Sequence, residues 1–374
     1  MAEDGSPPAE APVAETELKP RPRRSRLLRR FGPAALAIAV IVATFAYFLP
    51  SIANYGDVWA VVETLSWGWI AALLVATAVN LATFAPPWQV ALPGLSYVRA
   101  MELTQASTAL SIVFPGGVAV GAAGSYGMTR RWGFPRPAIV RAITLTSLWN
   151  QFLNLTFPIV AVFLLVVSGD QTAALATAAF VGVAILAVAV TGFVLILVSN
   201  RLANDLGDVA ARFVNWIRAK IHRRPVGWGG PSFERFRIDV GDFLERRWAP
   251  LTLASLAGNL TVFGVLLVSL RALDVTSAQV SFDEAFAAWA LVRLIASIPI
   301  TPGGVGVVEL GLTGALVGFG GANAHVVAAV LVFRALTVIP TLVLGLIAVG
   351  LTWRRGRVPD AAITISTPTE RTGL

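Results

Sequence analysis

The sequence predicts an all-α, polytopic helical membrane protein with about six full spans, two re-entrant or short-helix hairpins and an inverted-topology internal repeat. Three observations predict this fold class: the apolar composition, the long uncharged runs and the similarity between the two halves. Of the 374 residues, 56% are hydrophobic and only 13% are charged, whereas a soluble domain is about 25% charged. Such a chain has too little polar surface to cover itself in water, which excludes an ordinary soluble enzyme.

The composition also excludes several kinds of functional site. The chain has no cysteine and only two histidines, His222 and His325, so disulfides, thiolate metal sites and multi-histidine metal sites are not expected. We therefore predict no metal and no cofactor. The net charge is +8, and in a membrane protein such an excess reports orientation and contact with anionic lipid head groups. Nucleic acid is accordingly not an expected partner.

The uncharged runs define the predicted spans, because a crossing helix needs roughly 20 mostly apolar residues. We expect full spans at about 31–49, 67–86, 139–167, 173–199, 249–270 and 325–352, within a transmembrane domain over residues 31–353. Residues 1–30, whose second half is strongly basic, and residues 354–374 are predicted to be disordered tails.

Two segments, 99–128 and 284–320, follow another plan, in which two short arms flank a Pro-Gly-Gly break. Each arm has only about 15 residues, or roughly 22 Å at 1.5 Å per residue, which is short for a full crossing. Paired short arms around such a break predict re-entrant hairpins. Broken helices at membrane depth are tolerated only where protein or a water-filled cavity surrounds them.

The distribution of basic residues predicts the orientation. Placing both termini, Arg99, residues 130–141 and residues 200–247 in the cytoplasm puts 26 of the 29 Lys and Arg residues inside, as the positive-inside rule requires. We expect a multi-pass protein of the plasma membrane. Within the cytoplasmic loop, residues 201–221 carry apolar side chains at helical spacing among charges, which predicts an amphipathic helix on the inner leaflet.

The second half of the chain resembles the first. The run WIAALLVATAVNLATF, which contains Asn80, matches WAPLTLASLAGNLTVF, which contains Asn259, without a gap. PGGVAV from Pro115 then matches PGGVGV from Pro302, and the Arg-Ala-Ile-Thr from Arg141 matches the Arg-Ala-Leu-Thr that follows later. Repeat one covers about 67–168, the amphipathic loop 200–247 follows, and repeat two covers about 248–353. The predicted orientation inverts one repeat relative to the other, which is typical of transporters.

The second break, Pro302-Gly303-Gly304-Val305-Gly306-Val307-Val308-Glu309, is the densest candidate site. A helix that starts after the break presents free N–H groups and a positive dipole end, which suit a phosphate or carboxylate. The alternative is plain helix packing through small residues, as in Gly314-x-x-x-Gly318 or Gly117-x-x-x-Gly121.

Three charges, those of Glu309, Arg293 and Arg334, fall at membrane depth, where charges are costly and face a cavity or one another. Either the arginines meet an anionic head group, or Glu309 forms a buried structural ion pair. Arg141 lies closer to the cytoplasmic surface, where its side chain can reach the head groups. The candidate substrate-binding residues are Pro302, Gly303, Gly304, Gly306, Glu309, Arg334, Arg293, Arg141, Pro115, Gly116 and Gly117, and no catalytic residue is predicted.

The segment SIPITPGGVGVVELGLTGALVGFG, followed by VLVFRALTVIPTLVLG, resembles the flippase-like family named for the transmembrane region of lysylphosphatidylglycerol synthases. The resemblance extends over roughly residues 33–353. It implies an integral membrane protein that moves or handles lipids, in some members an aminoacylated phosphatidylglycerol. Glu309 and Arg334 match the family motif, whereas Ala122 stands at the position of the first hairpin that corresponds to Glu309. Lysylation of lipid by this chain is not expected.

Together these features predict a lipid flippase or translocator, rather than an enzyme, for an anionic or aminoacylated phospholipid or a lipid-linked precursor. Its predicted partners are membrane lipids with anionic head groups. One alternative is a non-transporting membrane subunit or scaffold that recruits a separate lipid- or envelope-synthesis enzyme. The other is an intramembrane enzyme that acts on a lipid.

Overall fold

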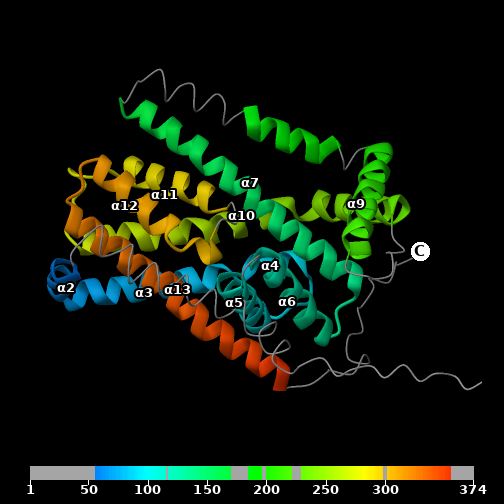
Figure 1. Ribbon diagram of the computed structural model, residues 1–374, viewed down its shortest axis with the longest axis horizontal. Coiled ribbons are helices and arrows are strands. Elements are labelled where there is room, and N and C mark those ends of the chain that lie inside the picture. The colour runs from blue at the N-terminus through cyan, green and yellow to red at the C-terminus, as the bar shows by residue number, and fades with distance from the viewer. Residues whose placement is uncertain are drawn as a thin grey trace, which may run out of the picture.

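The computed structural model describes residues 55–114, 117–169, 184–195, 199–220, 229–297 and 301–354, and every regular element within these ranges is a helix (Figure 1). The predicted span at 31–49, the tail 1–30 and residues 355–374 lie outside the described residues. Pro115 and Gly116 of the first break lie outside them as well.

Four helical segments are long and apolar enough to cross a membrane: Trp67–Ala91, Arg136–Val167, Glu234–Ala272 and Asn323–Thr352. They correspond to four of the six predicted spans. The first consists of α3 (Trp67–Thr83) and the short α4 (Pro86–Ala91), while α7 (Arg136–Val167), α10 (Gly230–Ala272) and α13 (Asn323–Arg354) supply the others. Of the predicted span 173–199, the structure describes the apolar helix Ala184–Leu195.

Helix α10 begins much earlier than the predicted span at 249–270. It has 43 residues, or about 65 Å at 1.5 Å per residue, which is roughly twice the hydrocarbon thickness. The added half is rich in Asp, Glu and Arg, so apolar composition alone does not reveal it. The part of the predicted 200–247 loop that the structure describes is therefore helical, with α9 (Asn200–Lys220) preceding α10.

Four short helices form the two predicted hairpins: α5 (Tyr97–Val113) with α6 (Gly117–Arg131), and α11 (Phe282–Ala296) with α12 (Val307–Gly318). They have 17, 15, 15 and 12 residues, or about 18–26 Å each, short of the ~30 Å hydrocarbon core. The leading arms start alike, because Ser96 caps α5 and Ser281 caps α11 through a side-chain oxygen.

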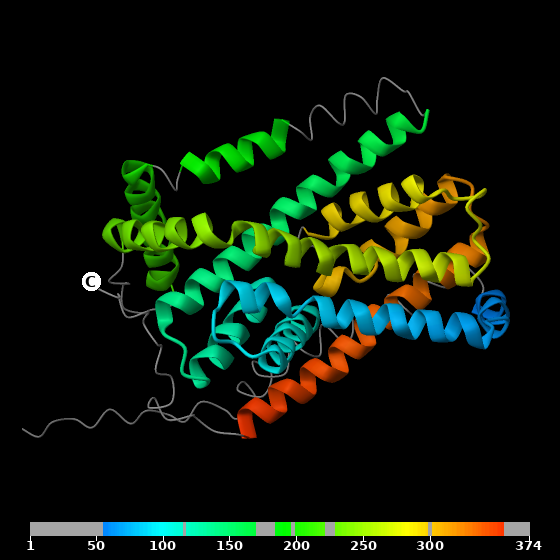
Figure 2. The same ribbon diagram turned by 180° about the vertical axis from the view of Figure 1, so that it is seen from behind.

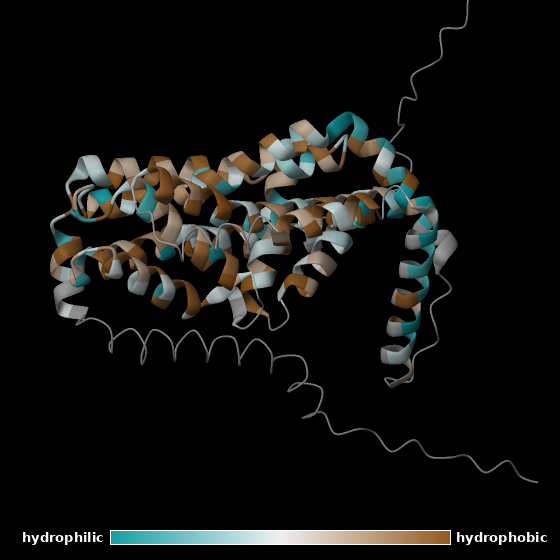
Figure 3. Ribbon diagram, turned by 90° about the horizontal axis from the view of Figure 1, so that it is seen from above, coloured by the Kyte–Doolittle hydropathy of each residue, from teal (hydrophilic) through white to brown (hydrophobic). Residues whose placement is uncertain are grey.

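The hairpins lie toward opposite ends of the molecule (Figures 1 and 2). The α5–α6 hairpin lies near the beginning of α7 and the end of α13, whereas α11 and α12 lie toward the end where α2 (Tyr55–Glu63) packs on the beginning of α13. Hydrophilic residues are concentrated at the opposite end, on α9 and the first half of α10, beyond the apolar bundle (Figure 3).

Aromatic side chains join the helices around the second hairpin. Phe263 of α10 packs edge-on against Phe286 of α11 with the ring centroids 5.1 Å apart, and Phe157 of α7 meets Trp289 of α11 at 5.0 Å. Such pairs add to the burial of apolar surface. They fix α11 between α7 and α10, and thereby fix the position of Arg293, one turn beyond Trp289.

Glycines permit the closest helix contacts of the first hairpin. A Cβ at Gly117 or Gly121 of α6 would overlap Ser111 or Ser107 of α5, and one at Gly345 of α13 would overlap the α5 backbone at Gln105. The packing interpretation therefore holds for Gly117-x-x-x-Gly121. It does not hold for Gly314-x-x-x-Gly318, because neither of those two glycines has an atom of the described residues within 4 Å of an added Cβ.

Candidate functional site

The second break is a glycine-dependent turn. Gly303, Gly304 and Gly306 have φ values of 63°, 67° and 86°, in the left-handed region that glycine adopts without steric cost. The three-residue 3-10 turn Pro302–Gly304 precedes α12. A Cβ at Gly303 would lie 3.0 Å from the side chain of Ile112, so this break packs against the end of α5 in the first hairpin.

Glu309 and Arg334 form an ion pair beside this turn. Glu309 is 2% exposed, and its Oε1 accepts a hydrogen bond of 2.6 Å from Nε of Arg334. Its Oε2 accepts another, of 2.7 Å, from the backbone N–H of Gly306 at the start of α12. Arg334 Nη2 also donates to the Gly303 carbonyl at 3.2 Å. The carboxylate of Glu309 thus occupies the helix N-terminus at which the sequence predicted a ligand anion.

Arg293 on α11 has a different environment. It donates from Nε to Oδ1 of Asn154 at 2.8 Å and from Nη2 to Oδ1 of Asn150 at 3.4 Å and to Oδ1 of Asn259. Its guanidinium also lies over the Trp289 ring, 5.3 Å from the centroid. None of these partners is a carboxylate. Within the described part of the chain, Arg293 therefore brings a positive charge without a carboxylate partner to the place where α7, α10 and α11 meet.

A polar pocket of about 250 Å³ adjoins the asparagine partners of this cation, between α10 and the helices α5 and α7. Asn150 and Asn259 line it and separate it from Arg293. The rest of the wall comes from the α3–α4 junction, α5, α7 and α10: Phe84, Pro87, Trp88, Thr104, Ser107, Thr108, Thr146, Ser147, Ser255 and Gly258. Because Arg293 can only donate, the two asparagines must present oxygens to it, and the amide nitrogen of Asn259 donates to the Ser255 carbonyl at 2.7 Å.

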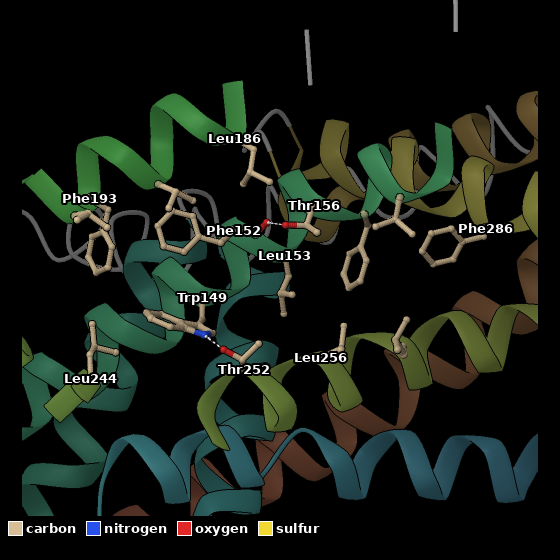
Figure 4. A pocket seen from close by; sticks show the side chains of 15 residues that line it. Trp149, Phe152, Leu153, Thr156, Leu186, Phe193, Leu244, Thr252, Leu256 and Phe286 are labelled. Atoms are coloured by element: carbon tan, nitrogen blue, oxygen red, sulfur yellow. Dashed lines mark hydrogen bonds between the residues drawn. The ribbon is translucent and has the colours of Figure 1, made fainter. Parts of the chain in front are cut away.

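An apolar pocket of about 730 Å³ lies on the other side of α7 and α10, where the helix Ala184–Leu195 covers it (Figure 4). Phe152 and Phe193 line it, their ring centroids 5.4 Å apart. Trp149 and Thr252 also line it, and their 2.8 Å hydrogen bond from Nε1 to Oγ1 ties α7 to α10 (Figure 4). Trp149 directly precedes Asn150, so this hydrogen bond lies where the two pockets approach each other.

The other candidates lie apart from the polar pocket. Arg141 pairs with Asp239 of α10 at 2.6 Å and lies over the Phe243 ring at 4.7 Å from the centroid. The sequence predicted that this side chain can reach the lipid head groups. It did not predict the partner Asp239, because Asp239 lies in the charged first half of α10, beyond the predicted span. Gly117 serves the α5–α6 contact. No group of three or more acidic or histidine side chains that could hold a metal occurs in the part of the chain that the structure describes.

Sequence reasoning missed Asn150, Asn154 and the hydroxyl groups of the polar pocket. A signal was present, because Thr146, Asn150 and Asn154 recur every four residues and so lie on one face of a helix. The prediction for Arg293 lacked its partners because they come from α7 and α10, which are more than 100 and about 30 residues away in the chain.

Comparison with known proteins agrees with this architecture. The family model described as the lysylphosphatidylglycerol synthase TM region matches residues 34–345, which is most of the chain. No curated protein matches the sequence significantly.

Proposed function

The chain belongs to the family of lysylphosphatidylglycerol synthase transmembrane regions, and on that premise we propose that it moves an anionic lipid across the bilayer. The observation that carries the proposal is the polar pocket backed by Arg293, a cation at membrane depth whose partners are all neutral amides or an aromatic ring. Charged residues within a membrane are costly and usually serve a substrate path. A cation without a carboxylate partner favours a visiting anion.

The arrangement of the helices supports movement rather than static binding. Each repeat runs from an apolar helix through a short-armed hairpin to a helix of 32 residues, α7 in one and α13 in the other. The hairpins lie toward opposite ends of the molecule (Figure 1). In our proposal the repeats are related by inverted topology, and the polar pocket between them gives access to each side in turn.

The two pockets together suit an amphiphile. In the proposal the head group occupies the polar pocket, and the hydrocarbon chain lies in the apolar pocket across α7 and α10. Continuity supports this assignment, because Trp149 and Asn150 are neighbours on α7, and Ser255 and Leu256 are neighbours on α10, with one member of each pair lining each pocket. The Trp149–Thr252 hydrogen bond ties α7 to α10 where the two pockets approach each other.

In the proposal, the Glu309–Arg334 pair is a second charged site along the path that the lipid head group takes. It lies beside the second break, whose Gly303 packs against Ile112 at the end of α5. Separation of the pair would expose Arg334 to a passing head group.

The proposal is tested by Arg293→Gln in the full chain, reconstituted into liposomes that contain labelled phosphatidylglycerol. Glutamine still hydrogen-bonds the asparagines but removes the charge, so we expect lipid movement to fall at least tenfold in protein that remains folded. Arg201→Gln removes a charge from the surface of α9 and should leave the rate unchanged. Arg293→Lys keeps the charge and should retain part of the activity. Movement at the unmodified rate by folded Arg293→Gln would refute the proposal.

A further inference from the structure

The hydroxyl groups of the polar pocket fall into two chemical sets. In the first set, each hydroxyl donates its hydrogen to a backbone carbonyl: Thr104 to Ala100 at 2.9 Å or to Phe84 at 3.2 Å, Ser107 to Thr104 at 3.1 Å and Thr146 to Ala142 at 2.8 Å. Once its hydrogen is used in this way, a hydroxyl offers only oxygen lone pairs to a ligand. This set is therefore a row of acceptors, which suits ligand groups that donate.

The second set can donate to a ligand. The hydroxyls of Thr108, Ser147 and Ser255, and the amide nitrogen of Asn150, have no hydrogen-bond partner within the described part of the chain, and all four residues line the pocket. The Oδ1 of Asn150 faces Arg293, which leaves its two N–H groups for the pocket. These donors suit the oxygens of a phosphate.

The charge around the pocket decides between an anionic and a cationic head group. No acidic side chain is among the described residues that line it, and Arg293 is hydrogen-bonded to the lining residues Asn150 and Asn259. An ammonium group placed there would be desolvated beside a cation with no counter-charge, which is strongly unfavourable. A phosphate at the same place gains from the positive potential of Arg293.

We infer that the polar pocket selects a phosphate that carries free hydroxyl groups, the head-group chemistry of a phosphoglycerol or phosphosugar lipid, and rejects amine-bearing head groups. The inference rests on the proposed function and names its substrate class. The phosphate takes the donor set and the hydroxyls of the head group take the acceptor set. The lipid source is favoured over a free phosphate ester because the apolar pocket adjoins the polar one across α7 and α10.

A binding measurement tests this without depending on transport. The purified full chain in detergent is titrated with short-chain phosphatidylglycerol, phosphatidic acid and phosphatidylethanolamine, and with free glycerol phosphate, with thermal unfolding as the readout. We expect phosphatidylglycerol to bind about fivefold more tightly than phosphatidic acid, since each hydrogen bond to a head-group hydroxyl adds a modest net gain. Phosphatidylethanolamine and free glycerol phosphate should bind more weakly than phosphatidic acid.

The double variant Ser107→Ala/Thr146→Val removes two acceptors whose own hydrogen bonds lie within their helices. It should bind phosphatidylglycerol and phosphatidic acid equally, at the affinity that phosphatidic acid has for the unmodified chain. Thr77→Val is the matched control, because its hydroxyl makes the same kind of bond, to the Leu73 carbonyl of its own helix, but Thr77 lines neither pocket. It should keep the preference for phosphatidylglycerol.

The outcomes separate the inference from the proposed function. Equal or tighter binding of phosphatidylethanolamine, or an unchanged preference in the double variant, would overturn the head-group assignment even if liposomes show lipid movement. Selective binding of phosphatidylglycerol without any movement in liposomes would overturn the translocator and keep the assignment. Free glycerol phosphate that binds as tightly as the lipid would overturn the lipid source.

Discussion

Three arginines of similar sequence context have three different partners. Arg334 pairs with a carboxylate that is 2% exposed and Arg141 pairs with the half-exposed Asp239. Among the described residues, the polar partners of Arg293 are amides, and its guanidinium lies over an indole ring. An ion pair within the bundle offsets the desolvation of both charges. Amides satisfy the donors of a guanidinium but leave its charge uncompensated. Arg293 therefore favours an anion site, whereas the charges of the other two arginines are balanced by carboxylates.

The Glu309–Arg334 pair makes a prediction about stability. Glu309→Gln or Arg334→Gln alone leaves a buried charge without its partner, which costs about 3–5 kcal/mol. We expect each single variant to lower the melting temperature strongly and the double variant to regain most of the loss.

Lipid movement separates the two interpretations of this pair. We expect the double variant to fold without moving lipid, because Arg334 is the second cation on the proposed path. If the double variant moves lipid at the rate of the unmodified chain, the ion pair serves stability alone.

At the scale of the elements, apolar runs and glycine breaks predicted the bundle well and the polar contacts poorly. The span at 139–167 and the short arms at 99–128 could be predicted because their signals are local: uninterrupted apolar length and a Pro-Gly-Gly break. The extension of α10 could not, because its first half is charged, and a search for apolar runs does not detect a charged helix. The asparagines around Arg293 come from different helices, so only the packed fold unites them.

The crossing of α13 over α5 depends on Gly345. An added Cβ there would overlap the Gln105 carbonyl and the Ala109 side chain, and backbone cannot move aside as the end of a flexible side chain can. We expect Gly345→Ala to lower the melting temperature of the purified chain by several degrees. Gly350→Ala lies on the same helix with no atom of the described residues within 4 Å of its new Cβ. It should leave stability unchanged or raise it slightly, because alanine favours helix over glycine. Equal effects of the two variants would contradict this crossing.

At the scale of the whole molecule, the axis of the bundle has two chemically different ends. Helix α9 and the charged half of α10 gather at one end, and the α10–α11 loop with Asp274, followed by Asp283 in the first turn of α11, lies at the other (Figures 1 and 2). Residues 200–247 hold ten of the 29 basic residues. The positive-inside rule therefore predicts that the α9 end faces the cytoplasm.

The absence of cysteine from the chain makes this orientation measurable. Val209→Cys places a thiol on the exposed surface of α9, and Ser277→Cys places one on the exposed loop between α10 and α11. In intact cells, a membrane-impermeant maleimide should label the thiol at 277 and should reach the thiol at 209 only after the membrane is permeabilised. Labelling of each cysteine variant is measured in the whole chain, and the unmodified cysteine-free chain gives the background signal. The reverse labelling pattern would mean that α9 and the charged half of α10 lie outside the cell. That result would contradict the orientation that the distribution of basic residues predicts.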